Sequence, residues 1–102
     1  MQKREIGTVV SNVAAADKLH FIKIRLPEIS ADLVPGNFVS FLPPAESGAF
    51  LRRPFSVAGN SDGCLDFVIK NIGKGTAAIT ALKEDSEVEI LGPLGNRYLE
   101  ID

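Results

Sequence analysis

Cysteine and histidine are almost missing from these 102 residues, which contain one of each, Cys64 and His20. A single cysteine excludes an internal disulfide framework, a four-cysteine zinc site and a cysteine-ligated iron–sulfur cluster. One histidine leaves too few ligands for most transition-metal sites, so we expect no metal site. His20 alternates with apolar residues, which predicts the outward face of a strand and no catalytic role.

Long apolar runs are missing as well. The longest has four residues, positions 13–16, against the about 20 that span a bilayer. Lys3 and Arg4 are not followed by the about 7–15 apolar residues of a secretory signal. We therefore expect no membrane association and a cytoplasmic protein.

An excess of positive charge is also missing, since the net charge is −2 and the isoelectric point is about 5.3. A general nucleic-acid-binding protein needs a basic face, so nucleic acid is not an expected partner. Positions 52–76 nevertheless carry four cations against two anions, a balance of +2 that leaves −4 for the rest of the chain. This distribution predicts a small anionic ligand near the middle of the chain.

The periodicity predicts a mainly all-β fold in a single domain. One short helix is predicted from an N-cap at Thr76 to about Lys83. The turn residues at 60–63 predict that the fourth and fifth strands form an antiparallel hairpin. Six antiparallel strands favour a closed Greek-key barrel with the helix capping one end. The six predicted strands are residues 6–13, 19–26, 38–42, 54–58, 65–72 and 87–91.

The first motif with chemical content is Arg53–Pro54–Phe55–Ser56. Pro54 has a fixed φ near −65° and keeps Arg53 extended, so the positions of Arg53 and Ser56 are predefined. An arginine can bind two phosphate oxygens at once, and a serine hydroxyl can bond to a heteroaromatic nitrogen. The alternative is that Arg52 and Arg53 are solvated charges at a loop end, with Pro54 marking the first strand position.

The second motif, residues 68–76, runs from a strand through Gly73 and Gly75 into the predicted helix. Glycines let backbone N–H groups approach a phosphate, and a helix N-terminus is positive. Residues 73–78 match a dinucleotide fingerprint, but the strand at 87–91 has no carboxylate at its tip, as a Rossmann unit requires. The plain alternative is a helix start preceded by flexible glycines.

Together with Leu-Gly-Pro-Leu-Gly-Asn at 91–96 and Pro-Gly-Asn-Phe-Val at 35–39, these motifs resemble the FAD-binding barrel of the ferredoxin–NADP reductase superfamily. The resemblance covers essentially the whole chain. Within the superfamily it is strongest to the electron-transfer subunits of bacterial, NAD-dependent, two-subunit dihydroorotate dehydrogenases. It implies a domain that helps to pass electrons between a partner dehydrogenase, in pyrimidine biosynthesis, and NAD.

The resemblance also implies FAD as the cofactor and a set of residues that bind it. Arg53, Gly75 and Thr76 would hold the pyrophosphate. Ser56 would hydrogen-bond near flavin N5, the atom that accepts hydride. The family usually has arginine at the position of Lys70, and lysine offers a point charge in place of a fork. The implied cofactor-binding residues are Arg53, Pro54, Phe55 and Ser56 on one side, and Val68, Ile69, Lys70, Gly75 and Thr76 on the other.

Family members continue into a nicotinamide-binding domain and a segment that holds a 2Fe–2S cluster, and neither is present in these 102 residues. We therefore expect one FAD-binding domain over 1–102 that acts with a catalytic subunit of a partner dehydrogenase. Alone it is expected to be inactive toward NADH. The alternatives are a flavin-free β-barrel interaction module and the FAD domain of another NAD(P)H-linked or ferredoxin-linked reductase.

Overall fold

The computed structural model describes residues 3–15, 18–42 and 53–95. Within these ranges it contains seven strands and two short helices, in place of the six strands and one helix expected. No helix in this part of the chain is long and apolar enough to cross a membrane. The elements in chain order are β1 (Lys3–Ala14), β2 (Leu19–Arg25), α1 (Pro27–Asp32), β3 (Phe38–Leu42), β4 (Arg53–Ser56), β5 (Gly59–Ser61), β6 (Cys64–Lys70), α2 (Lys74–Thr80) and β7 (Glu87–Leu94).

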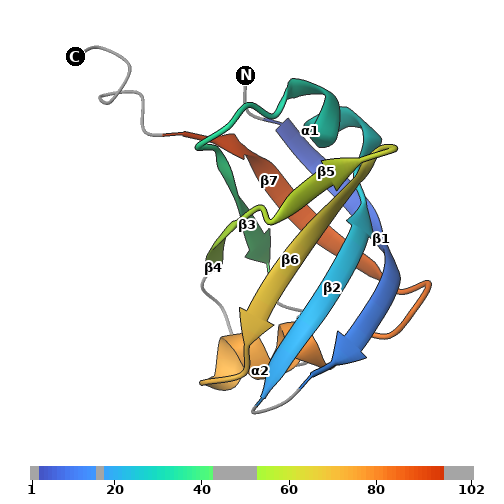
Figure 1. Cartoon of the computed structure of the whole chain (residues 1–102), viewed down its shortest axis with the longest axis vertical. Coiled ribbons are helices and arrows are strands. Elements are labelled where there is room, and N and C mark those ends of the chain that lie inside the picture. The colour runs from blue at the N-terminus through green and yellow to red at the C-terminus, as the bar shows by residue number, and fades with distance from the viewer. Residues whose placement is uncertain (1–2, 16–17, 43–52, 96–102) are drawn as a thin grey trace.

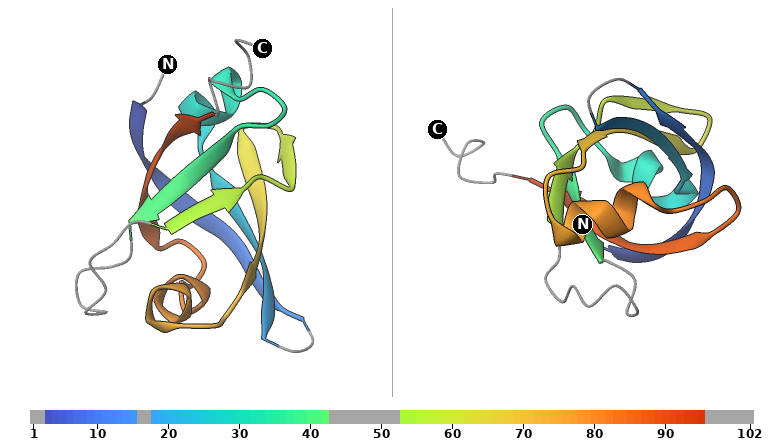
Figure 2. Two further views of the ribbon diagram at one scale, coloured as in Figure 1. Left: turned by 90° about the vertical axis from the view of Figure 1, so that its left-hand side faces the viewer. Right: turned by 90° about the horizontal axis from the view of Figure 1, so that it is seen from below.

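The strands form one sheet in the order β4-β3-β7-β1-β2-β6-β5, and its neighbouring strands are antiparallel. The sheet curls until β4 lies beside β6, which makes a barrel (Figure 1). Helix α1 lies at one end of this barrel, and α2 crosses the other end (Figure 2). The mainly all-β antiparallel barrel predicted from the sequence is therefore confirmed.

Alternation along the strands separates the barrel core from its surface, because successive strand residues point to opposite faces. In the middle of the core the Phe41 ring meets the Phe55 ring at 5.2 Å and the Phe67 ring at 4.9 Å between centroids, both edge to face. Such pairs add to the stabilisation that burial alone gives. The buried apolar residues are Val9, Ile22, Ile24, Leu26, Ile29, Val39, Phe41, Leu65, Phe67, Ile69, Ile79, Val88 and Ile90.

The predicted hairpin is displaced by one strand. Strand β4 pairs with β3, with Phe38 opposite Ser56, and the partner of β6 is the short strand β5. The β5–β6 turn is made by Asp62 and Gly63, both at positive φ (55° and 77°), as a two-residue hairpin turn requires. The chain leaves the strand conformation at 57–58, so the segment predicted as one strand is divided between two sheet neighbours.

Helix α2 begins three residues earlier than predicted, since Gly73 is its N-cap and Thr76 its third residue. It ends at Thr80, not at Lys83.

The predicted outward orientation of His20 is also wrong. His20 lies on the same face of β2 as the buried Ile22, and it is half-buried with Nδ1 2.9 Å from the Asn12 Oδ1 atom. A polar partner at the barrel end allows a histidine on the inner face.

Helix α1 was not predicted, because a segment of six residues starting at Pro27 is too short to show a periodic pattern. Its N-terminus lacks a side-chain cap from the preceding residue, Leu26. Instead the buried carboxylate of Glu5, on β1, accepts hydrogen bonds from the Glu28 and Ile29 amides at 3.1 and 2.8 Å. A strand residue thus supplies the cap that the local sequence lacks.

We expect Glu5→Gln to lower the free energy of unfolding by about 1–3 kcal/mol, because the neutral amide offers one acceptor to two buried amides. Urea denaturation monitored by circular dichroism measures this change. Asp32→Asn, which removes the exposed ion pair with Lys3 (2.8 Å), is the control and should have a smaller effect. Equal losses in the two variants would show that Glu5 is not the cap of α1.

Candidate functional site

The two sequence motifs meet at a cavity on the seam of the barrel. The cavity has a volume of about 320 Å³ and is lined by Pro54 and Phe55 from β4 and by Ile72, Gly73 and Thr76 from the β6–α2 junction. Its volume falls in the range of small-ligand pockets, about 300–1,000 Å³. The motifs meet because the barrel closes between β4 and β6, not because the two segments form a hairpin.

Strand β4 supplies an apolar wall to this cavity. Phe55 is half-buried, and its ring packs edge to face on the buried Phe41 ring, so the core fixes its position. Pro54 and Ser56 are exposed, and Pro54 also lines the cavity. Proline is tolerated because β4 is an edge strand. Arg53 is the first residue of β4, and its side chain lies outside the described part of the chain.

The β6–α2 turn is held together by one hydroxyl group. The Thr76 Oγ1 atom accepts hydrogen bonds from the Ile72 and Gly73 amides, both at 3.0 Å, and donates to the Gly73 carbonyl at 3.1 Å. This hydroxyl is therefore engaged within the turn. A contact from Thr76 to a phosphate would come from its backbone amide, since the amides of the first helical turn have no partner within the helix.

The turn also presents open apolar surface to the cavity. The Ile72 side chain is 75% exposed, and a Cβ atom placed on Gly73 would meet no atom within 4 Å. An exposed large apolar side chain opposite the Phe55 wall suits a planar heteroaromatic group, and the adjacent turn backbone suits phosphate. Ile72 was missed by sequence reasoning, although its place directly before the first glycine was a usable signal.

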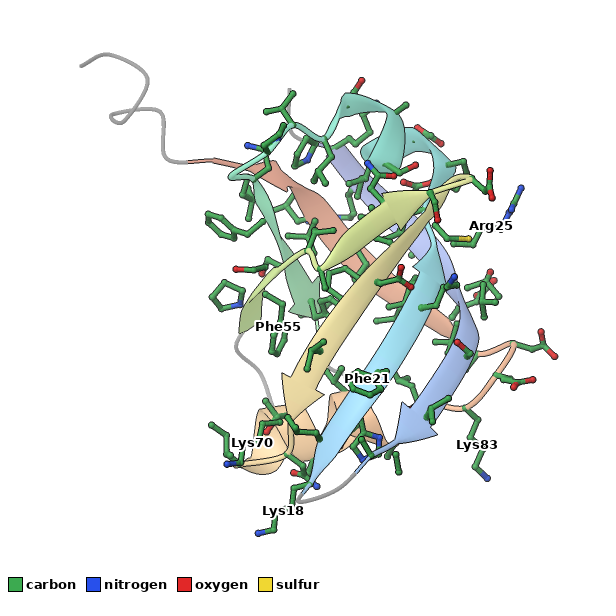
Figure 3. The ribbon with its side chains drawn as sticks, in the orientation of Figure 1. Lys18, Phe21, Arg25, Phe55, Lys70 and Lys83 are labelled. Carbon is green, nitrogen blue, oxygen red and sulfur yellow. The ribbon has the colours of Figure 1, made fainter. Side chains whose placement is uncertain are left out.

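The three consecutive residues predicted on β6 do not share one surface. The Ile69 side chain is 1% exposed and belongs to the core, while Val68 is 50% exposed on the outer face of the sheet. Val68 lines, together with Phe21, a hollow of about 400 Å³ that is separate from the cavity at the seam. Lys70 is exposed at the end of β6, on the side of the barrel that leads to the junction (Figure 3). Strand alternation thus turns the Ile69 side chain into the core and the Val68 side chain to the outer face, and the role of these residues in binding the cofactor stays a prediction.

The Rossmann interpretation of 73–78 fails on topology. A Rossmann unit needs strands before and after the helix that are parallel neighbours. Here β6 pairs with β2 and β5, whereas β7 pairs with β1 and β3, and all four pairings are antiparallel. An antiparallel barrel with an apolar wall and a glycine turn at its seam defines instead a barrel-type nucleotide cofactor domain.

Residues 7–98 match the model of the oxidoreductase FAD-binding domain family. The chain belongs to this family, and FAD is its cofactor. The cavity fits that cofactor, because it combines an apolar wall for the flavin ring with a turn that has free space beside Gly73 for the phosphates. Family membership favours the flavoprotein interpretation over the flavin-free barrel.

Curated relatives point to one branch of flavoproteins. The chain is 29% identical over 98 residues to a Fusobacterium nucleatum protein named dihydroorotate dehydrogenase B (NAD(+)), electron transfer subunit, covering 94% of this chain and 38% of the relative. A Listeria monocytogenes protein of the same name is 31% identical over 93 residues, covering 88% and 35%. The chain therefore spans less than two fifths of the length of these relatives.

Solved structures agree on the fold. The structure of an NADH-dependent reduced ferredoxin-NADP oxidoreductase superposes with a TM-score of 0.77 and 29% identity, over 88% of this chain and 34% of that one. The cytochrome b5 reductase domain of Ulva prolifera nitrate reductase has a TM-score of 0.74 at 18% identity, over 91% and 40%. The second similarity extends the shared fold to a reductase of low sequence identity.

Proposed function

We propose that this chain is the FAD-binding domain of an electron-transfer subunit that passes electrons between a partner dehydrogenase, a dihydroorotate dehydrogenase, and NAD in the cytoplasm. The observation that carries the proposal is the shared cavity, which joins the Arg53–Ser56 motif to the Gly73–Thr76 turn. The names of the curated relatives support the choice of partner.

Within the cavity, the residues divide into two groups. Pro54, Phe55 and Ile72 would contact the flavin ring, with Ser56 near N5. Arg53 and the backbone amides of Gly75 and Thr76 would hold the pyrophosphate, and Lys70 would add positive charge at the side. Bound FAD supplies hydride and single-electron transfer, while the chain supplies position and electrostatics.

The nicotinamide and iron–sulfur functions of the complex are proposed to lie outside residues 1–102. Hydride transfer needs the nicotinamide carbon held at about 3–3.5 Å from flavin N5, which requires a second dinucleotide site. The glycine turn that could serve a dinucleotide already lines the FAD cavity. The catalytic subunit of the dehydrogenase and a nicotinamide-binding part are thus the proposed partners.

A second candidate is the FAD domain of a ferredoxin-linked reductase. The ferredoxin-NADP oxidoreductase structure is as similar to this chain, at 29% identity, as the Fusobacterium subunit is. The two candidates share the cavity and differ in the partner that reduces the flavin.

The chain should bind FAD more tightly than FMN or riboflavin, because the phosphate-binding groups lie beside the ring-binding wall. Titration of the apoprotein with each flavin, followed by quenching of flavin fluorescence, measures the preference. Riboflavin tests the ring contacts alone. Equal affinity for all three flavins would show that Arg53, Gly75 and Thr76 do not engage a pyrophosphate.

The FAD-loaded chain is expected to lose its flavin absorbance when dihydroorotate, the catalytic subunit of the dehydrogenase and the proposed iron–sulfur part, the last two from the same organism, are present together. NADH alone should give no saturable turnover, since no nicotinamide site has been assigned within 1–102. Anaerobic absorbance spectra, with each component omitted in turn, provide the measurement. Bleaching by reduced ferredoxin but not by dihydroorotate would favour the second candidate.

A further inference from the structure

The side chain of Asn12 ties β1 to the C-terminal end of α2. Its Nδ2 atom donates hydrogen bonds to the Thr80 carbonyl at 2.9 Å and to the Leu82 carbonyl at 2.7 Å, across 68 and 70 residues of sequence. Carbonyl groups at a helix end have no partner within the helix. Asn12 therefore provides, from a strand, the C-terminal cap of α2.

The whole amide group of Asn12 is used. Two carbonyl oxygens face its nitrogen, which fixes the amide orientation because an oxygen at that place would repel both. Its Oδ1 atom then faces His20 Nδ1 at 2.9 Å, so His20 Nδ1 carries the hydrogen and donates it. Both the nitrogen and the oxygen of this side chain therefore have partners, which hold the side chain in one orientation.

Helix α2 depends on such a tie. It has seven residues, about 10 Å in length, and isolated helices of that size are not stable in water. Ile79 is fully buried and anchors the helix in the core by apolar contact. The Thr80 hydroxyl bonds within the helix, to the Thr76 and Ala77 carbonyls, and so does not attach α2 to the barrel. Asn12 adds a directional attachment at the end opposite the cavity.

We propose that Asn12 is a positioning residue of the cofactor site: it acts through α2 to place the Gly73–Thr76 turn against the β4 wall. The inference rests on the proposed function, since it assigns the turn to the pyrophosphate half of FAD. Asn12 itself does not line the cavity. Without its two hydrogen bonds, α2 can rotate about Ile79, and this rotation moves the turn while leaving the ring wall on β4 in place.

Strand β1 offers a matched control. Glu5 holds α1 at the other end of the barrel by two hydrogen bonds, as Asn12 holds α2. A substitution at Glu5 thus loosens a short helix of the same barrel, far along β1 from the cavity. Comparing the Asn12 and Glu5 variants therefore distinguishes displacement of the turn at the site from a general loss of stability.

The experiment compares Asn12→Ala with Glu5→Gln, in the full chain, at a temperature where circular dichroism shows all proteins folded. For Asn12→Ala we expect the FAD dissociation constant to rise about 5–20-fold, equivalent to about 1–2 kcal/mol, because a displaced turn makes weaker hydrogen bonds to the pyrophosphate. The riboflavin dissociation constant should stay within a factor of about two, because the ring wall is unchanged. Glu5→Gln should alter neither constant by more than that factor.

His20→Ala is the milder variant, for use if Asn12→Ala does not fold. It removes the partner of Oδ1 alone and should reduce the preference for FAD over riboflavin in the same direction by a smaller factor. The inference is overturned if Asn12→Ala, or His20→Ala in its place, keeps the wild-type preference, or if Glu5→Gln reduces the preference equally. A wild-type chain with no preference for FAD would instead refute the proposed site, and the role of Asn12 with it.

Discussion

Replacing Phe41 with alanine is expected to lower the free energy of unfolding by about 3–5 kcal/mol, the usual cost of removing a buried phenyl ring. Phe41 is fully buried and packs edge to face against Phe55 and Phe67, so the variant loses both ring contacts and leaves a cavity. A domain of this size has about 5–15 kcal/mol of stability in total. Urea denaturation should show a much lower midpoint.

Phe21→Ala is the matched control for Phe41, because the Phe21 ring is 49% exposed on the outer face of the sheet. It should cost clearly less than the core variant. Phe41→Leu keeps most of the volume and should remain folded, with a loss of up to about 1.5 kcal/mol. FAD should also bind more weakly to Phe41→Ala than to Phe21→Ala, since Phe41 supports the Phe55 wall. Equal stability losses at positions 41 and 21 would contradict the assigned core.

Arg53→Ala should weaken FAD binding by about 10–100-fold, equivalent to the about 1.5–3 kcal/mol of a charge-assisted hydrogen bond. Arg53 directly precedes Pro54, which lines the cavity, so the prediction assigns its guanidinium to the phosphate groups of a ligand bound there. Arg53→Lys retains the charge without the fork and should recover part of the affinity. Fluorescence titration of each apoprotein with FAD measures the three constants.

Arg52→Ala serves as the control for Arg53. Position 52 lies outside the described residues, but alternation along the strand predicts that neighbouring side chains face opposite ways. A change of less than about threefold is expected for a charge that does not contact the ligand. If Arg52→Ala weakened FAD binding more than Arg53→Ala, the register assigned to the ligand-facing side of β4 would be reversed.

Local sequence patterns were sufficient to predict the class of fold and the positions of most strands. Alternation identified β1, β2, β6 and β7, in which buried residues alternate with more exposed ones, whereas β3 was predicted by its β-branched and aromatic residues. The Asp62–Gly63 turn was likewise predictable, since few residue pairs adopt positive φ easily. Helix α1 was not, because its cap comes from Glu5, which is 23 residues away from Glu28.

The candidate site was likewise predicted from the sequence only in part. The family resemblance selected Pro54, Phe55 and Thr76, which line one cavity. It did not identify Ile72, and it did not show that the Val68 and Ile69 side chains face opposite ways. A motif records which residue types are present, whereas the direction of each side chain follows from the strand register.

The sequence by itself determined the antiparallel barrel class, the two motifs and the resemblance that led to FAD, because these depend on residue type, spacing and local periodicity. The tertiary structure alone decided that the motifs meet across the barrel seam and not in a hairpin. It also decided that Thr76 holds the turn from inside the helix and that Asn12 caps α2 from β1. Such contacts join residues up to 70 positions apart, and they form only when the sheet curls and closes.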